Sequence, residues 1–372
     1  MFKQALNQLL AREDLSFDTM LSVMQQVMGG ELTPAQIAAL LVALRMKGET
    51  VEEISAAATV MRSLSTKVDI QDHAYLVDTC GTGGDGIQTF NVSTACAFVA
   101  AAAGAKVAKH GGRSVSSTCG SADVLEVLGV DVNRTPAQVA NSVNAIGIGF
   151  MFAPNHHSAM KHAAPVRREL GVRTIFNLLG PLTNPASAKR QVMGVFDKHL
   201  TTKLAHVLQH LGAEHVLVVH GEDGMDEISF SGDTFVAELK NGKIHEYTLN
   251  PAHFGLPHHD LSQIQVENAE QSKAIILDVL NGKQGAARDI VLLNAGAAIY
   301  VSGAVDSLAA GVKKAAEVID NGAALAKLEA LKETSRSMKK YLFLFVLLSA
   351  LVACKQNTSS LSAGNTATSR TK

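Results

Sequence analysis

Glycines and short polar residues gather in one stretch of the 372-residue chain, VDTCGTGGDGIQTFNVST at residues 77–94. Three of its glycines match the pattern GxGxxG, which occurs in dinucleotide-binding loops but also in ordinary turns between a strand and a helix. A dinucleotide site also needs an acidic residue about 20 residues further on, to hold the ribose hydroxyls. The first acidic residue after Asp85 is Asp123. The sequence therefore disfavours a nicotinamide enzyme.

Basic and hydroxyl residues follow instead, in the motif KHGGRSVSS at residues 109–117. Glycines let backbone N–H groups approach phosphate oxygens, and the polar run NVST lies where a helix is expected to begin, which favours an anion. The chain has no glycine-rich loop followed by GK[ST], which excludes a P-loop ATPase. These features predict a site for a ligand richer in phosphate than a dinucleotide.

The composition sets broad limits on the class of protein. Hydrophobic residues make up 47% and the formal net charge is −1, which predicts a large packed core and no nucleic-acid partner bound by bulk charge. The four cysteines form no CxxC pair, so we expect reduced thiols in a cytoplasmic protein. The histidines of NHHSAMKH, residues 155–162, lack the i, i+4 spacing of a helical zinc site.

The pattern of elements predicts two folded parts and an appended tail. Residues 1–70 contain only helix signals, among them caps at Ser16, Thr33 and Thr50. Residues 71–337 alternate between short apolar strands and helices, which predicts an α/β fold with a central sheet flanked by helices. Strands are expected in AYLVDTC, AKVAKH, IGFMF and HVLVVHG, and a hairpin in FVAELKNGKIHEYTL, with helices again from about residue 268.

Residues 338–372 begin with MKKYLFLFVLLSALVAC and resemble a bacterial lipoprotein signal peptide with its lipobox, at the wrong end of the chain. The uncharged part, residues 341–354, is shorter than the roughly 20 residues that a spanning helix needs. We expect an appended segment outside the fold, with no functional membrane span.

Five motifs resemble those of the anthranilate phosphoribosyltransferases of tryptophan biosynthesis. In chain order they are GTGGD, NVST, KHGGRSVSS, APVRRELGVRTIFNLLGPLTNP and GMDEIS, and the resemblance runs from about residue 3 to 335. It implies a small all-helical domain joined to a larger α/β domain, a fold shared with the pyrimidine nucleoside phosphorylases, usually as a homodimer. The implied reaction transfers the phosphoribosyl group of 5-phosphoribosyl 1-diphosphate to the amine of anthranilate and releases diphosphate.

The resemblance also implies residue roles. The phosphoribosyl diphosphate would contact Gly81, Gly84, Asp85, Thr89, Asn91, Val92, Ser93, Thr94, Lys109, His110, Gly111, Gly112, Arg113, Ser114, Val115, Ser116, Ser117 and Ser121. Anthranilate would contact Gly81, Gly112 and Arg167, with His110, His157 and Pro181 along its path. Mg²⁺, two ions per subunit, would be held by Ser93, Asp226 and Glu227.

The residue types suit these roles. Carboxylates and substrate phosphate oxygens are the ligands that Mg²⁺ prefers, and a guanidinium matches a planar carboxylate. One position departs from the family, which usually has Asn where this chain has Gly112. That Asn helps to hold the anthranilate amine, so the amine contact is left open.

Three alternatives remain. A nucleoside phosphorylase would share the fold, but it would bind inorganic phosphate and need no acidic metal pair, so Asp226 and Glu227 disfavour it. A related transferase could act on another aromatic or nucleic-acid ligand. The tail alone suggests a membrane-tethered binding protein.

Overall fold

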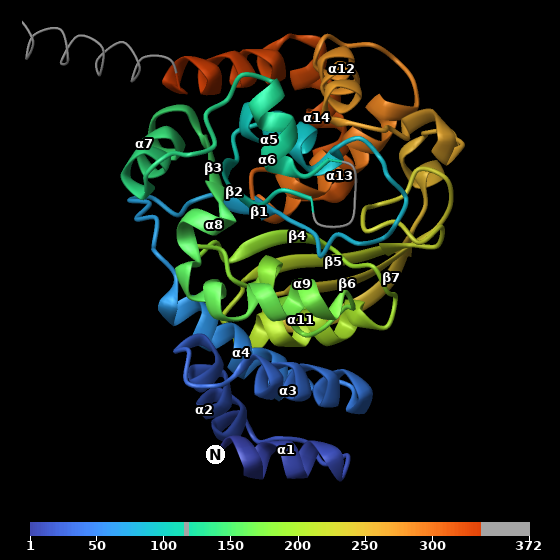
Figure 1. The fold of residues 1–372 in the computed structure, drawn as a ribbon. Coiled ribbons are helices and arrows are strands. Elements are labelled where there is room, and N and C mark those ends of the chain that lie inside the picture. Colours follow the sequence, from blue (N-terminus) through green and yellow to red (C-terminus); the bar gives the residue numbers. More distant parts are fainter. Residues whose placement is uncertain (115–118, 336–372) are drawn as a thin grey trace, which may run out of the picture.

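The computed structural model describes residues 1–114 and 119–335 (Figure 1). The predicted tail and the loop residues Val115, Ser116 and Ser117 lie outside the described residues. Within the described part, no helix is both long and apolar enough to cross a bilayer.

The N-terminal part is a bundle of helices: α1 (Phe2–Leu10), α2 (Phe17–Met28), α3 (Pro34–Lys47) and α4 (Val51–Leu64). The three predicted caps are confirmed. The Ser16 hydroxyl accepts a hydrogen bond from the backbone N–H of Thr19, and Thr33 and Thr50 each form a capping box. Local sequence thus determines where three of these helices begin.

The larger part is built on a seven-stranded sheet, in the order β3-β2-β1-β4-β5-β6-β7. The strands are β1 (Leu76–Thr79), β2 (Lys106–Gly111), β3 (Ile148–Phe152), β4 (Arg190–Gly194), β5 (His215–Gly221), β6 (Thr234–Lys240) and β7 (Lys243–Leu249). The first five in this order are parallel, and β6 and β7 form the predicted antiparallel hairpin. The predicted fold class is confirmed.

Strand β4 was not predicted. It is short and almost fully buried in the middle of the sheet, so it lacks the alternation of polar and apolar residues that marks a half-exposed strand.

Helices cover both faces of the sheet (Figure 1). They are α5 (Val92–Ala102), α6 (Ser121–Val127), α7 (Pro136–Ile146), α8 (Ala153–His156), α9 (Ala164–Leu170), α10 (Phe176–Leu179), α11 (Leu200–His210), α12 (Ala269–Leu280), α13 (Ala286–Ser302), α14 (Leu308–Asp320) and a last helix at 323–335. Helix α13 packs against β1, β4, β5 and α5 on one face, and α11 packs against β5, β6 and α4 on the other.

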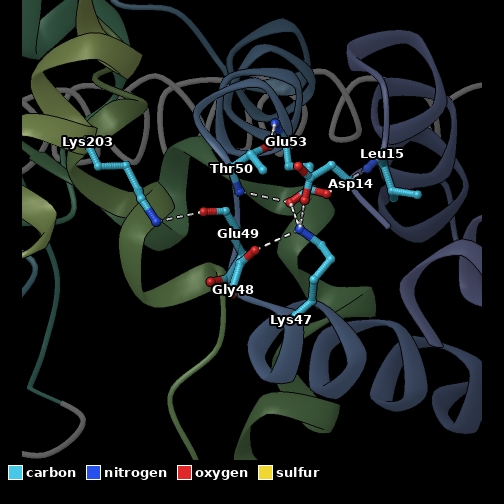
Figure 2. A network of polar contacts seen from close by, with 8 residues as sticks. All are labelled: Asp14, Leu15, Lys47, Gly48, Glu49, Thr50, Glu53 and Lys203. Carbon is cyan, nitrogen blue, oxygen red and sulfur yellow. Dashed lines mark hydrogen bonds and ion pairs between the residues drawn. The ribbon is translucent and has the colours of Figure 1, made fainter. Parts of the chain in front are cut away.

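A polar network fixes the corner between α3 and α4 (Figure 2). Lys47 contacts Glu53 at 3.1 Å, and the fully buried Glu53 carboxylate accepts the backbone N–H of Leu15 at 2.8 Å. From α11, Lys203 donates to the carbonyl of Glu49 at 2.9 Å. This last bond ties the helical bundle to the α/β part.

Candidate active site

A groove of about 360 Å³ opens at the carboxyl ends of β1 and β2, the edge of a parallel sheet where ligands usually bind. It brings together most of the residues named from the sequence: Gly81, Gly84, Asp85, Thr89, Asn91, Val92, Ser93, Lys109, His110, Gly111, Gly112, Arg113, Ser114, Ser121, Arg167, Pro181, Asp226 and Glu227. Thr94 is buried behind it, and its hydroxyl has no hydrogen-bond partner in the described structure.

The glycine loop after β1 approaches Asp226 closely. A Cβ at Gly81 would lie 2.9 Å from Asp226 Oδ2, so only glycine fits without a shift. The backbone N–H of Gly83, where φ is +64°, donates to the same oxygen at 2.9 Å. The loop therefore turns at least one N–H group toward an anion, as its glycines predicted.

Helix α5 begins at the groove with Asn91 as its N-cap. The Asn91 side chain accepts the backbone N–H of Thr94 at 3.0 Å and the Ser93 hydroxyl at 3.2 Å. Lys109, only 3% exposed, donates to Ser93 Oγ at 2.9 Å and to the carbonyl of Thr79. A helix N-terminus and a buried ammonium group thus converge on one place, which suits a highly charged anion.

Three carboxylates, those of Asp85, Asp226 and Glu227, line the same groove. The backbone N–H of Asp226 donates to Asp85 Oδ2 at 3.3 Å. Burial and then the charge of Asp85 raise the pKa of Asp226 to about 7, and burial and the charge of Asp226 raise the pKa of Glu227. Within the described residues, the Glu227 carboxylate forms no hydrogen bond or ion pair. Crowded carboxylates without enough positive partners fit a hard divalent cation such as Mg²⁺.

His110 lines the groove, and the buried His157, which does not line it, packs against His110. His110 Nε2 and His157 Nε2 are 3.2 Å apart, and His110 Nδ1 has no partner in the described structure. Burial first, and then neighbouring histidines, lower the pKa of His110 to about 3 and that of His157 to about 4. Both rings are therefore neutral at neutral pH.

Arg167 reaches the groove from α9. Its guanidinium carbon lies 5.5 Å from the centre of the Phe176 ring, and burial lowers the pKa of the group. Its side chain forms no hydrogen bond or ion pair with the part of the chain that the structure describes. A half-buried guanidinium resting on an aromatic ring is suited to a planar carboxylate ligand.

Two residues of the KHGGRSVSS motif, Gly112 and Arg113, offer the groove less than their predicted roles require. Arg113 contacts Glu126 with two hydrogen bonds of 2.7 and 2.8 Å and Asp123 with one of 3.0 Å, so acidic side chains already hold its charge. A Cβ at Gly112 would meet no atom within 4 Å. The place of the family's usual Asn is therefore open space in this chain.

Sequence reasoning missed two supporting side chains. Arg173 donates to the carbonyl of Gly84 and stacks 4.1 Å from the centre of the Phe196 ring. Asn184 donates to Asp78 Oδ2 at 2.7 Å. Both lie within a motif that carried the resemblance, but only the fold shows where their side chains reach.

Two family models match the two folded parts. The helical bundle domain of the glycosyl transferase family matches residues 3–65, and the a/b domain of the same family matches residues 73–325. Fold and groove thus define a glycosyl transferase built from a helical bundle and an a/b domain.

Individual proteins similar to this chain show which kind of glycosyl transferase it resembles. The anthranilate phosphoribosyltransferase of Methylobacillus flagellatus is 65% identical over 335 residues, 90% of this chain and 98% of the relative, and that of Chromobacterium violaceum is 59% identical over 334 residues, 90% and 98%. The solved structure of the Thermus thermophilus enzyme has a TM-score of 0.84 at 43% identity, covering 89% of this chain and 99% of that one. A Saccharomyces cerevisiae enzyme in complex with PRPP and Mg has a TM-score of 0.80 at 29% identity, covering 90% and 98%.

This chain therefore belongs to the anthranilate phosphoribosyltransferase family. It is an enzyme that transfers a phosphoribosyl group to anthranilate.

Proposed function

We propose that the groove at the carboxyl ends of β1 and β2 is where this chain makes N-(5-phosphoribosyl)anthranilate and diphosphate. One observation carries the assignment. The N-terminus of α5 and Lys109 form an anion-binding position, and it lies in the same groove as the unpaired carboxylate of Glu227. A substrate diphosphate together with a divalent cation would satisfy both. The Saccharomyces cerevisiae relative has been described with PRPP and Mg, and separately with 4-fluoroanthranilate.

The donor side holds the diphosphate. In this proposal the glycine loop, the α5 N-terminus and Lys109 contact its oxygens, and Asp226, Glu227 and Ser93 hold Mg²⁺, with two ions per subunit. When bound, Mg²⁺ neutralises the charge that builds up on the departing diphosphate. The Gly83 N–H donates to Asp226 Oδ2 in this structure, and it would be free for a phosphate oxygen if Asp226 held the metal.

The acceptor side holds anthranilate. Arg167 binds its carboxylate, and the neutral ring of His110 together with Pro181 flanks the aromatic ring, while the neutral ring of His157 supports His110 from outside the groove. Backbone groups of Gly81 and Gly112 would contact anthranilate, and which group holds its amine is left open. No covalent nucleophile is needed, because positioning the amine near C1 and stabilising the leaving group lower the barrier.

The enzyme is proposed to act as a homodimer in the cytoplasm. The three cysteines in the described residues are free thiols, which accords with a reducing compartment. Sedimentation equilibrium of the purified chain measures the assembly, and a mass of one subunit at micromolar concentration would contradict the dimer.

Complementation tests the function in a cell. A tryptophan auxotroph that lacks this activity should grow without tryptophan when it expresses this chain. Expression of a chain with Arg168→Ala, an exposed neighbour of Arg167, should rescue equally well. Failure of the folded wild-type chain to rescue growth would reject the proposal.

A further inference from the structure

The end of β1 separates side chains onto two faces of the sheet. The Thr79 hydroxyl points toward α5, where it donates to the carbonyl of Ser93. Asp78 and Cys80 are two residues apart and lie on the opposite face, because side chains alternate along a strand. The β1–β2 register pairs residue 76 with 106 and 77 with 107, which brings His110 level with Cys80.

We propose that Asp78, Cys80 and His110 form a site for a thiophilic divalent cation such as Zn²⁺. Its ligands differ from the proposed magnesium ligands Asp226 and Glu227, although Cys80 lines the same small cavity as these two. One potential ligand atom from each residue lies within 4.8 Å of the other two. Sulfur, imidazole nitrogen and carboxylate oxygen form a typical zinc donor set, whereas Mg²⁺ requires oxygen donors. The two sites therefore select different ions.

The nitrogen and oxygen ligands are buried and lie within reach of the Lys109 charge. His110 is 3% exposed, its ring lies near the backbone of Gly180, and its lowered pKa keeps the ring neutral. Asp78 Oδ1 accepts the backbone N–H of His110 at 3.1 Å, and Oδ2 accepts Asn184 at 2.7 Å. These bonds orient the carboxylate and still leave lone pairs for a metal.

Cys80, the sulfur ligand, is the member of the proposed site that an ion can reach from solvent. Cys80 is half-buried and lines the groove, so an ion can reach it from solvent. Burial, followed by the charge of Asp78, raises the pKa of its thiol, so the neutral form is present before metal binds. Binding converts Cys80–SH and Zn²⁺ into Cys80–S⁻–Zn²⁺ and releases one proton to the buffer.

The geometry requires a small closure. Zinc–ligand distances of about 2.0–2.3 Å place tetrahedral ligand atoms roughly 3.3–3.8 Å apart, so the three side chains move together by about 1 Å. A fourth position faces the groove and can hold water. The ion would lie beside the His110–His157 pair, on the side proposed for anthranilate.

This location predicts the form of inhibition, which rests on the proposed function. Zn²⁺ should inhibit competitively with anthranilate, and excess Mg²⁺ should not relieve the inhibition. Relief by Mg²⁺ would mean that Zn²⁺ acts at Asp226 and Glu227 and would overturn the proposal.

Direct metal binding provides the test that does not depend on activity. In a Cys354→Ser background, Co²⁺ should give a thiolate-to-metal charge-transfer band with the wild-type Cys80 and none with Cys80→Ser. Cys96→Ala is the matched control, because Cys96 is a buried thiol of α5 whose Sγ contacts the carbonyl of Val291 at 3.7 Å, and this variant should keep the band.

The same variants should differ in their sensitivity to inhibition by Zn²⁺. The Zn²⁺ concentration for half inhibition should rise at least about tenfold in Cys80→Ser and stay unchanged in Cys96→Ala. Cys80→Ala gives the same comparison if the serine variant does not fold. A Co²⁺ band that persists without Cys80 would overturn the site, whereas a wild-type band without transferase activity would count against the proposed function alone.

Discussion

The two ends of the sheet treat their polar side chains in opposite ways. At the amino ends of β4 and β5, beside a cavity of about 530 Å³, Glu238 accepts hydrogen bonds of 2.8 Å from His215, Tyr247 and Tyr300. Burial opposes ionisation of Glu238, but these hydrogen bonds outweigh it and lower its pKa. At the carboxyl ends, Glu227 has no partner in the described structure and its pKa is raised.

The difference shows how to tell a structural network from a binding site. Buried polar groups are normally satisfied, so a network that the protein completes by itself serves the fold. A cluster whose charged groups stay unsatisfied and whose pKa values are raised needs a ligand to complete it. By this criterion we propose the groove of about 360 Å³ at the carboxyl ends of β1 and β2 as the functional site.

The largest effect should come from removing the unsatisfied acids. Asp226→Asn with Glu227→Gln should lower Mg²⁺-dependent turnover by at least about 10³-fold, because the cation loses its carboxylate ligands. The metal-free variant should be no less stable than the wild type, since charge repulsion is removed. Turnover and thermal melting measure both effects. Retained activity with an unchanged Mg²⁺ requirement would contradict the claim that the unsatisfied acids mark the metal site.

The matched change at the other end is Tyr300→Phe. It removes one of the three hydrogen bonds to Glu238 and should cost about 1 kcal/mol of unfolding free energy while kcat/KM and the Mg²⁺ requirement stay unchanged. A large loss of turnover here would show that the completed network also takes part in catalysis.

Loss of the unpaired guanidinium should act on one substrate. Arg167→Ala should weaken anthranilate binding by about 1.5–3 kcal/mol, roughly 10- to 100-fold in its KM, because a charged hydrogen-bonding partner is lost. The KM for phosphoribosyl diphosphate should change far less. Arg168→Ala, an exposed neighbour, is the control. Equal changes in both KM values would argue against the assignment of Arg167.

Protonation should compete with the metal. The folded state holds the Asp226 proton up to a pKa of about 7, whereas an unfolded carboxyl group loses it near 4. This group therefore makes metal-free stability fall as pH rises between these values. Mg²⁺ must displace the proton, so its apparent affinity should weaken roughly tenfold from pH 8 to pH 6. A pH-independent Mg²⁺ affinity, measured by calorimetry, would contradict the raised pKa.

The smallest effect is expected at the open position. Gly112→Asn adds a side chain where a Cβ meets no atom within 4 Å, so the fold should tolerate it. The amide can reach the anthranilate amine and should lower the anthranilate KM by about two- to tenfold. Steady-state kinetics with each substrate varied decides the matter, and a higher KM would mean that the added side chain blocks the acceptor.

Local patterns were sufficient to predict much of this molecule. The caps at Ser16, Thr33 and Thr50 and the hairpin at Asn241 are encoded by neighbouring residues, so sequence alone located them. The buried strand β4 carries no such signal.

The candidate site could be predicted only in part. The glycine loop and NVST predicted a phosphate site by residue type, whereas the metal role of Asp226 and Glu227 came only from the family resemblance. Contacts between residues that are distant in the sequence could not be predicted in this way. Arg173 donates a hydrogen bond to Gly84, 89 residues away, and Arg113 pairs with Glu126 only because α6 folds back beside it. The pairing of Asp78, Cys80 and His110 likewise depends on the register of two strands.

The most direct test of the central claim is the product formed by the purified chain from anthranilate, phosphoribosyl diphosphate and Mg²⁺. Mass spectrometry and a diphosphate assay should find one N-(5-phosphoribosyl)anthranilate and one diphosphate for each anthranilate consumed, and no product after the metal is chelated. Absence of this product from the folded, Mg²⁺-supplied enzyme, or its undiminished formation by the Asp226→Asn, Glu227→Gln chain, would contradict the account.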